Sequence, residues 1–190
     1  MKIDSFSLGQ LQTNCYLLIS KKNNCIIIDP ADDANFISEQ ILIKKLTPKL
    51  IIATHGHFDH ILAAGELQKA FNIPFAINYK DLFLIKDVIK RVKYWLKNEI
   101  IFFPPTPTID LSEEKQITLD EIKIEVIPTP GHTPGSISLY IKNEKTLFTG
   151  DTYFKNAYSR TDFAYSNKSH HYKSVEKIKK LNAYTILPGH

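Results

Sequence analysis

The stretch that decides the fold is THGHFDH, residues 54–60, which follows a short apolar run. It holds three of the seven histidines in a chain of 190 residues. The set does not share one helix face, where side chains meet at intervals of three or four residues. In an extended loop, side chains alternate, so His55 and His57 would point the same way. A turn would then let Asp59 and His60 face a second point nearby, an arrangement that suits two neighbouring metal ions.

A plainer interpretation makes this stretch the start of a helix, with Asp59 as an acidic cap and the histidines in solvent by chance. For a lone histidine we would prefer this helix-start interpretation to a metal site. Here, however, further polar residues of the metal-ligand type also follow apolar runs, and loops at strand ends are where a rigid sheet holds functional side chains. These residues are Asp29 after CIII, His132 after IEVIPT, Asp151 after LFTG, and His190 after TILP. We therefore favour a metal site.

The types of ligand narrow the chemistry. The set contains no thiolate, which excludes a closed structural zinc site of the cysteine type. Histidine and carboxylate ligands suit zinc, iron or manganese and leave room for a bound water. We expect divalent metal ions, zinc before iron or manganese.

Length and composition predict one domain, residues 1–190, with a substantial core. The chain is 43% hydrophobic and 23% charged, with a formal net charge of +4. Its lysines and arginines are dispersed, which argues against nucleic acid as a partner. No apolar run approaches the length of a bilayer span, and the first residues lack the apolar core of a signal peptide. We expect a cytoplasmic protein that acts on a small molecule, and the sequence is silent on oligomeric state.

The two cysteines, Cys15 and Cys25, lie in apolar runs that are typical of strands. Two cysteines do not form a disulfide framework in a chain of this size. We therefore expect buried free thiols.

Hydrophobic periodicity predicts strands and helices in alternation. Strands are expected at 2–8, 14–20, 25–28, 50–53, 73–77, 122–127, 137–141, 147–149 and 184–187. Helices are expected at 34–46, 61–71, 80–97 and about 169–181. A proline-rich loop, residues 102–107, ends the longest helix.

Four motifs occur in a fixed order along the chain. They are THGHFDH after a strand, PGHTPGS at 130–136, TGD at 149–151 and PGH at 188–190. This set resembles the metallo-β-lactamase superfamily, and within it the short glyoxalase-II-like hydrolases. The resemblance covers nearly the whole chain, including TNCYLL at 13–18 and SRTDF at 159–163. It implies an α/β fold, a four-layer αββα sandwich.

The resemblance also implies roles for individual residues. Seven would be metal ligands: His55, His57 and His132 for one ion, Asp59, His60 and His190 for the second, with Asp151 bridging the two. Asp29 would orient a ligand imidazole from behind. Asp59 and Asp151 would be the catalytic carboxylates. Apart from the resemblance, the position of Lys155 and Arg160 after the TGD motif suggests that they bind an anionic substrate, although plain surface charge explains them equally well.

The implied activity is that of a binuclear metal-dependent hydrolase that attacks with a metal-bridging hydroxide. The metal would also polarise the carbonyl and stabilise the oxyanion. The sequence offers no obvious dedicated acid for the leaving group. A thiolate, with a thiol pKa of about 8.5, needs little protonation. We therefore expect a thioester or small ester as substrate, in preference to an amide or a β-lactam.

The sequence departs from the family pattern in two places. Residues 157–162, AYSRTD, lack the glycines that the family usually carries there. The family continues past PGH with a glycine and a closing helix, and this sequence ends at His190. We expect that the closing helix is missing, so that the chain is truncated or the second metal is weakly held. The resemblance does not extend to the glutathione-binding helical domain of longer glyoxalase II enzymes.

Other branches of the same fold remain as alternatives. The foremost is a mononuclear-iron sulfur oxygenase similar to persulfide dioxygenases, in which His55, His132 and Asp151 would hold iron and the RTDF element is shared. A diiron electron-transfer protein, a metal-dependent nuclease and a non-catalytic binding protein fit the residues less well.

Overall fold

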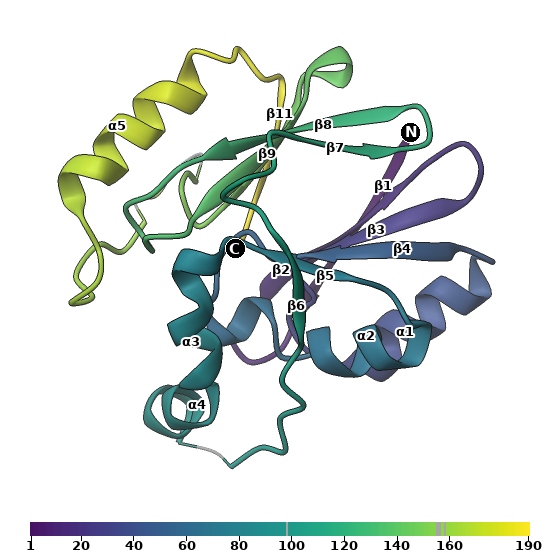
Figure 1. Ribbon diagram of the computed structural model, residues 1–190, viewed down its shortest axis with the longest axis horizontal. Coiled ribbons are helices and arrows are strands. Elements are labelled where there is room, and N and C mark those ends of the chain that lie inside the picture. The colour runs from purple at the N-terminus through teal and green to yellow at the C-terminus, as the bar shows by residue number, and fades with distance from the viewer. Residues whose placement is uncertain (98, 155–156, 158) are drawn as a thin grey trace.

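Two β-sheets pack face to face between outer helices (Figure 1). The computed structural model describes residues 1–97, 99–154, 157 and 159–190. Helices α1 and α2 cover the outer face of the N-terminal sheet, and α5 covers the outer face of the other sheet. The expected four-layer αββα sandwich is confirmed.

The N-terminal sheet has six strands in the order β1-β2-β3-β4-β5-β6. They are β1 Lys2–Leu8, β2 Thr13–Ile19, β3 Asn24–Ile28, β4 Thr47–Ile52, β5 Phe75–Ile77 and β6 Pro107–Asp110. The first three pair antiparallel, and β3 to β6 run parallel. The expectation of a plain loop through residue 107 was wrong at its end, because Pro107 opens β6. As an edge strand, β6 tolerates the missing N–H of a proline.

The second sheet has the order β11-β10-β9-β8-β7. Its strands are β7 Gln116–Leu119, β8 Ile122–Pro128, β9 Ile137–Ile141, β10 Thr146–Gly150 and β11 Thr185–Pro188. All neighbours pair antiparallel except β10 and β11, which run parallel. Strand β7 was not predicted from the sequence.

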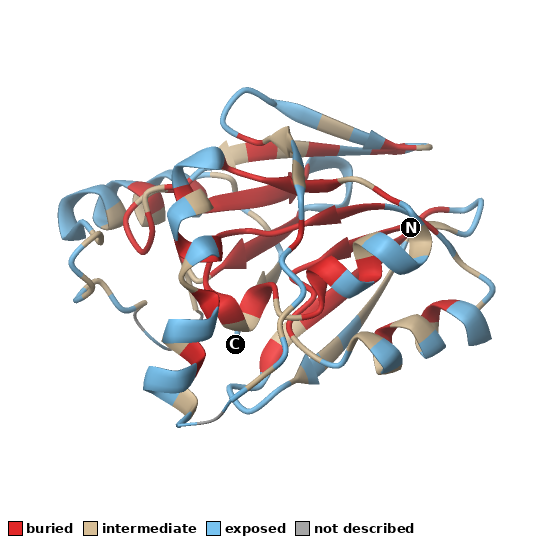
Figure 2. Ribbon diagram, turned by 60° about the horizontal axis from the view of Figure 1, so that its bottom comes forward, coloured by how far each residue is buried: buried red, intermediate tan, exposed pale blue. Residues whose placement is uncertain are grey.

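The central strands are buried on both faces, which explains their unbroken apolar runs (Figure 2). In β2, Leu17 faces the helices and Leu18 faces the second sheet. In β3, Ile27 faces the helices and Ile26 faces the second sheet. Side chains that alternate with a period of two therefore supply two separate cores, one between the sheets and one under the helices.

The helices are α1 Ala34–Ile43, α2 Ala64–Phe71, α3 Leu82–Lys86, α4 Val88–Leu96 and α5 Lys168–Lys179. The single helix expected at 80–97 is divided at Asp87, whose N–H bonds to Leu84 three residues back. Aspartate disfavours helix interiors because its side chain competes for backbone hydrogen bonds. Ile89, in the second of these two helices, is exposed to solvent.

Both cysteines are buried free thiols, as expected. Burial raises the pKa of Cys25 to about 12, so this thiol stays protonated and inert at neutral pH. No helix in the described part of the chain is long and apolar enough to cross a membrane. The expected cytoplasmic location stays a prediction.

Candidate metal centre

Loops at the ends of the strands bring the predicted ligands together at one edge of the two sheets. They form two adjoining groups whose ligand atoms lie within 4.8 Å of one another in each group. The first group comprises His55, His57, His132 and Asp151, and the second comprises Asp59, His60 and His190. The structure thus assembles all seven predicted ligands, although their role as ligands stays a prediction.

The backbone of residues 54–60 divides the stretch between these two groups. His57 is extended, with φ −67° and ψ 145°, and a single 3₁₀ turn follows at Phe58–His60. The extended part presents His55 and His57 to the first group, and the turn carries Asp59 and His60 to the second. The sheet fixes the start of the loop, because β4 ends directly before it.

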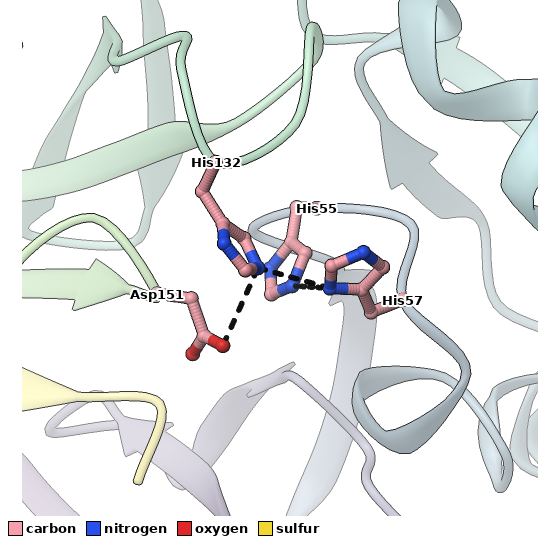
Figure 3. Close-up of side chains that lie close together, drawn as sticks. All are labelled: His55, His57, His132 and Asp151. Atoms are coloured by element: carbon pink, nitrogen blue, oxygen red, sulfur yellow. Dashed lines mark hydrogen bonds and ion pairs between the residues drawn. The ribbon is translucent and has the colours of Figure 1, made fainter. Parts of the chain in front are cut away.

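Three imidazoles converge in the first group (Figure 3). Nδ1 of His57 lies 3.0 Å from Nε2 of His55 and 2.9 Å from Nε2 of His132. Nε2 of His132 lies 3.5 Å from Oδ2 of Asp151. Four possible metal-ligand atoms, from three separate loops, therefore point toward the same place.

The carboxylate of Asp151 lies between the two groups. Its Oδ2 faces His132 of the first group, and its Oδ1 lies 3.4 Å from Nε2 of His60 in the second. Nε2 of His190 is 3.7 Å from Oδ2 of Asp151 and 3.3 Å from Oδ2 of Asp59. One carboxylate thus has an oxygen available to each group.

The outward-facing nitrogen of each of these imidazoles has its own hydrogen-bond partner. In the first group, Nε2 of His57 lies 2.7 Å from the hydroxyl of Tyr165, and Nδ1 of His132 lies 2.7 Å from the carbonyl of Arg160. Nδ1 of His55 lies 3.1 Å from Oγ1 of Thr54. With the outer nitrogen donating, the inner nitrogen keeps its lone pair and its direction.

In the second group, the same support comes from Asp29 and from the backbone. Oδ2 of Asp29 lies 2.9 Å from Nδ1 of His60, and the same carboxylate accepts hydrogen bonds from the N–H and hydroxyl of Thr54. Asp29 is therefore in contact with a ligand-type imidazole, the position that the resemblance implied. Nδ1 of His190 lies 3.0 Å from the carbonyl of Leu11.

Burial and the charge of neighbouring groups set the protonation of the ligands. Burial, assisted by the other imidazoles, holds the pKa of His55 well below its ordinary value and lowers the pKa of His57 to about 3. Both rings are therefore neutral at pH 7, as metal ligands must be. Burial alone would raise the pKa of Asp59, but His60 and His190 outweigh it and lower the pKa, so Asp59 is ionised.

The residues present fit a pair of metal ions. Ligand atoms around a tetrahedral ion with bonds of about 2.0–2.1 Å lie about 3.3 Å apart, close to the 2.9–3.5 Å in the first group. Among the described residues, Nε2 of His60 and Oδ1 of Asp151 are buried without a hydrogen-bond partner, and both belong to this centre. Buried polar atoms are normally satisfied, so a cation between them would explain the exception.

A cleft of about 300 Å³ opens over the centre. His57, Asp59, His132, Asp151 and His190 form its floor, and the walls are Leu11, Phe58, Arg91, Trp95, Phe154, Arg160, Phe163 and Tyr165. Predicted Arg160 does lie in the cleft, and it forms an ion pair with Asp162. Predicted Lys155 lies outside the described residues.

Sequence reasoning missed three residues of the site, Asp81, Arg91 and Tyr165. Asp81 is fully buried and accepts hydrogen bonds from the N–H of Gly56 and the N–H of Gly135, one in each histidine-bearing loop. None of the three lies in a motif with ligand spacing. Their signal is contact in three dimensions, which a single sequence does not reveal.

A family profile for the metallo-beta-lactamase superfamily matches residues 8–190. The chain belongs to the metallo-beta-lactamase superfamily. Within the superfamily it is similar to a probable metallo-hydrolase of Bacillus subtilis, YqgX, with 31% identity over all of this chain and 90% of the relative. It is also 32% identical to the hydroxyacylglutathione hydrolase GloC of Haemophilus influenzae, over all of this chain and 91% of the relative.

Solved structures of the superfamily share the fold over nearly the full length. The B3 metallo-beta-lactamase BLEG-1 superposes with a TM-score of 0.91 at 31% identity, covering all of this chain and 91% of that one. TTHA1623, solved in a di-iron-bound form, gives a TM-score of 0.88 at 28% identity, covering 98% of this chain and 91% of that one. The centre described here is a His/Asp metal site of the kind that binuclear members of this superfamily carry.

Proposed function

We propose that the protein is a binuclear metal-dependent hydrolase that cleaves a thioester or small ester. The observation that carries this proposal is the pair of adjoining ligand groups, with Asp151 between them, at the floor of an open cleft. The similarity to a probable metallo-hydrolase and to a hydroxyacylglutathione hydrolase supports the same reaction class. Zinc fits the donor set best, and the di-iron-bound relative keeps iron as the alternative.

The ligand groups define what each part of the centre contributes. Two divalent cations held there would supply a water of lowered pKa and would polarise a substrate carbonyl. The neutral imidazoles of His55 and His57 would leave the net positive charge of the centre in place to stabilise an oxyanion. The carboxylates of Asp59 and Asp151 face the cleft and would take up the proton of the attacking water.

The cleft favours a leaving group that departs as an anion. The hydroxyl group that lines the cleft, that of Tyr165, has a pKa raised by burial, so it is a weak acid toward a leaving group. An amine leaving group needs a proton, whereas a thiolate with a thiol pKa of about 8.5 needs little help. The apolar side chains of Trp95 and Phe163 form the cleft wall and would exclude bulk water around the acyl group.

The experiment combines metal analysis with hydrolysis of three substrates. The protein is purified without chelators, bound metals are counted per chain, and a hydroxyacylglutathione, a glutathione-free thioester and a β-lactam are assayed. We expect two ions per chain and thioester hydrolysis at least about a hundredfold above that of His57→Ala, which lacks one ligand.

Two results would overturn this proposal. A single iron per chain with oxygen uptake would identify the sulfur-oxygenase alternative. Cleavage of the β-lactam with both thioesters left intact would move the substrate class to amides, in line with the solved B3 relative.

A further inference from the structure

The wall of the cleft carries a guanidinium that no described carboxylate neutralises. Arg91, on α4, lines the cleft beside Tyr165 and is half-buried. In the part of the chain that the structure describes, no Asp or Glu oxygen lies within 4.0 Å of its guanidinium, which makes no ion pair. Its Nε is buried, and among the described residues it has no hydrogen-bond partner.

The second arginine of the cleft is different. Arg160 donates from Nε and Nη2 to the two carboxylate oxygens of Asp162, at 3.0 and 2.8 Å, and its guanidinium lies over the rings of Trp95 and Phe163. Its charge is therefore matched within the protein. Of the two cleft arginines, Arg91 is the one that lacks an anion.

Tyr165 holds Arg91 next to the metal ligands. Nη1 of Arg91 donates to the Tyr165 hydroxyl at 3.3 Å, and the guanidinium carbon lies 5.2 Å from the centre of the same ring. The Tyr165 hydroxyl in turn contacts Nε2 of His57 at 2.7 Å, and its ring stacks on Phe163. Only one side chain therefore separates the guanidinium of Arg91 from an imidazole of the centre.

We propose that Arg91 binds a carboxylate on the acyl part of the substrate, a few bonds from the scissile carbonyl. This inference rests on the proposed function and names the class of substrate within it. A partly desolvated guanidinium with free donors gains most from a planar oxyanion that accepts two hydrogen bonds. One unmatched positive charge suits a carboxylate, whereas a phosphate brings nearly two negative charges. The short path through Tyr165 to His57 requires a short acyl chain.

The test compares a succinyl thioester with its carboxamide isostere, the succinamyl thioester, on the metal-loaded protein. Both carry the same uncharged thiol, so only the acyl carboxylate differs. The variants are Arg91→Gln, Arg91→Lys and, as the matched control, Lys90→Gln. Lys90 is the neighbouring residue on α4 and its ammonium is exposed, so this control removes the same charge from the same helix. Circular dichroism establishes that each variant is folded.

We expect the wild type to prefer the succinyl thioester about tenfold in kcat/KM, mainly through KM, because a charged hydrogen-bonded pair forms on binding. Arg91→Gln should lose this preference, so that its kcat/KM becomes the same on the two thioesters. Arg91→Lys should keep part of it, and Lys90→Gln all of it. Equal rates on the two thioesters in the wild type, or a preference that survives in Arg91→Gln, would overturn the proposal.

A binding measurement separates this proposal from the proposed function. The non-hydrolysable thioethers that carry a 3-carboxypropyl or a 3-carbamoylpropyl group are titrated calorimetrically into each protein. Tighter binding of the carboxylate that disappears in Arg91→Gln supports the subsite even when no thioester is hydrolysed. Tighter binding that persists in Arg91→Gln places the carboxylate on the metal centre or on Arg160 and overturns the proposal.

Discussion

At the scale of single residues, Tyr165 connects the cleft wall to the metal ligands. Its hydroxyl oxygen is 2.7 Å from Nε2 of His57, whose Nδ1 faces His55 and His132. Partners behind a ligand imidazole fix its tautomer and its direction. The position of Tyr165 in the sequence AYSN gives no hint of this contact, because 108 residues separate it from His57.

Replacing Tyr165 with phenylalanine removes this acceptor and keeps the ring. We expect Tyr165→Phe to weaken metal binding at the first group about tenfold, the usual effect of losing such a partner. Competition with a chromophoric chelator measures the affinity. Tyr172→Phe, in an exposed tyrosine of α5, is the control and should bind metal like the wild type. An unchanged affinity in Tyr165→Phe would show that His57 is held in place without the hydroxyl.

At the scale of elements, Asp81 connects the two loops that carry the three histidines of the first ligand group. Its Oδ2 accepts from the N–H of Gly56 and the hydroxyl of Thr133, and its Oδ1 accepts from the N–H of Gly135, at 2.6–2.9 Å. A side chain has no room at either glycine. A Cβ at Gly56 would lie 2.9 Å from the Cβ of Asp81, and one at Gly135 would lie 2.6 Å from its Cγ. The glycines in THGH and TPGS are thus explained by the close approach of one residue, Asp81.

In an Asp81→Asn variant, the side-chain N–H₂ would face at least one of the N–H or O–H groups that donate to the Asp81 carboxylate. We expect Asp81→Asn to lower the free energy of unfolding by about 2–3 kcal/mol, since hydrogen bonds to a buried charged group are lost. Urea denaturation of the metal-free protein measures the change. Asp87→Asn, at the partly exposed break between α3 and α4, removes the same charge and should change stability far less. Equal losses in the two variants would contradict the connecting role of Asp81.

The division of the 80–97 segment also belongs to this scale. Periodicity predicted one helix, but the chain changes direction at Asp87, so that Val88 and Val92 are buried while Trp95, which is 44% exposed, lies on the cleft wall. The same turn brings Arg91 to Tyr165. The spacing of apolar residues indicates a helix, but it does not reveal that the helix axis changes direction within the segment.

At the scale of the whole molecule, the centre holds together loops that are far apart in sequence. His55 and His132 come from two different loops and His190 follows β11, and the two sheets meet at this edge. A ligand that binds only the folded state stabilises the whole chain. Metal ions that draw these loops together should therefore raise the stability of the complete fold.

We expect zinc to raise the midpoint of thermal unfolding of chelator-stripped protein by about 10 °C. This value follows from a free zinc concentration of about a thousand times Kd, worth about 4 kcal/mol, in a domain of this size. Scanning calorimetry with and without zinc measures the shift. Magnesium at the same concentration is the control, because it prefers six oxygen ligands. An equal shift with magnesium, or no shift with zinc, would contradict specific binding at the histidines.

The sequence by itself picked out the seven ligand-type residues of the centre, and the resemblance of its motifs to a known superfamily implied the family and the four-layer fold. These motifs can be read from the sequence because they are local. The alternation in THGHFDH depends on adjacent backbone geometry, and apolar runs such as CIII followed by Asp29 record a strand buried on both faces together with the loop at its end.

Only the tertiary structure decided what surrounds those ligands. The position of Asp151 between the two groups, the support of His57 by Tyr165, the link through Asp81 and the unmatched charge of Arg91 all join segments that are distant in sequence. Such contacts depend on how two sheets and their loops pack. No spacing along the chain encodes which distant side chain fills a given hydrogen bond, so the shape and charge of the cleft emerge only when the sheets come together.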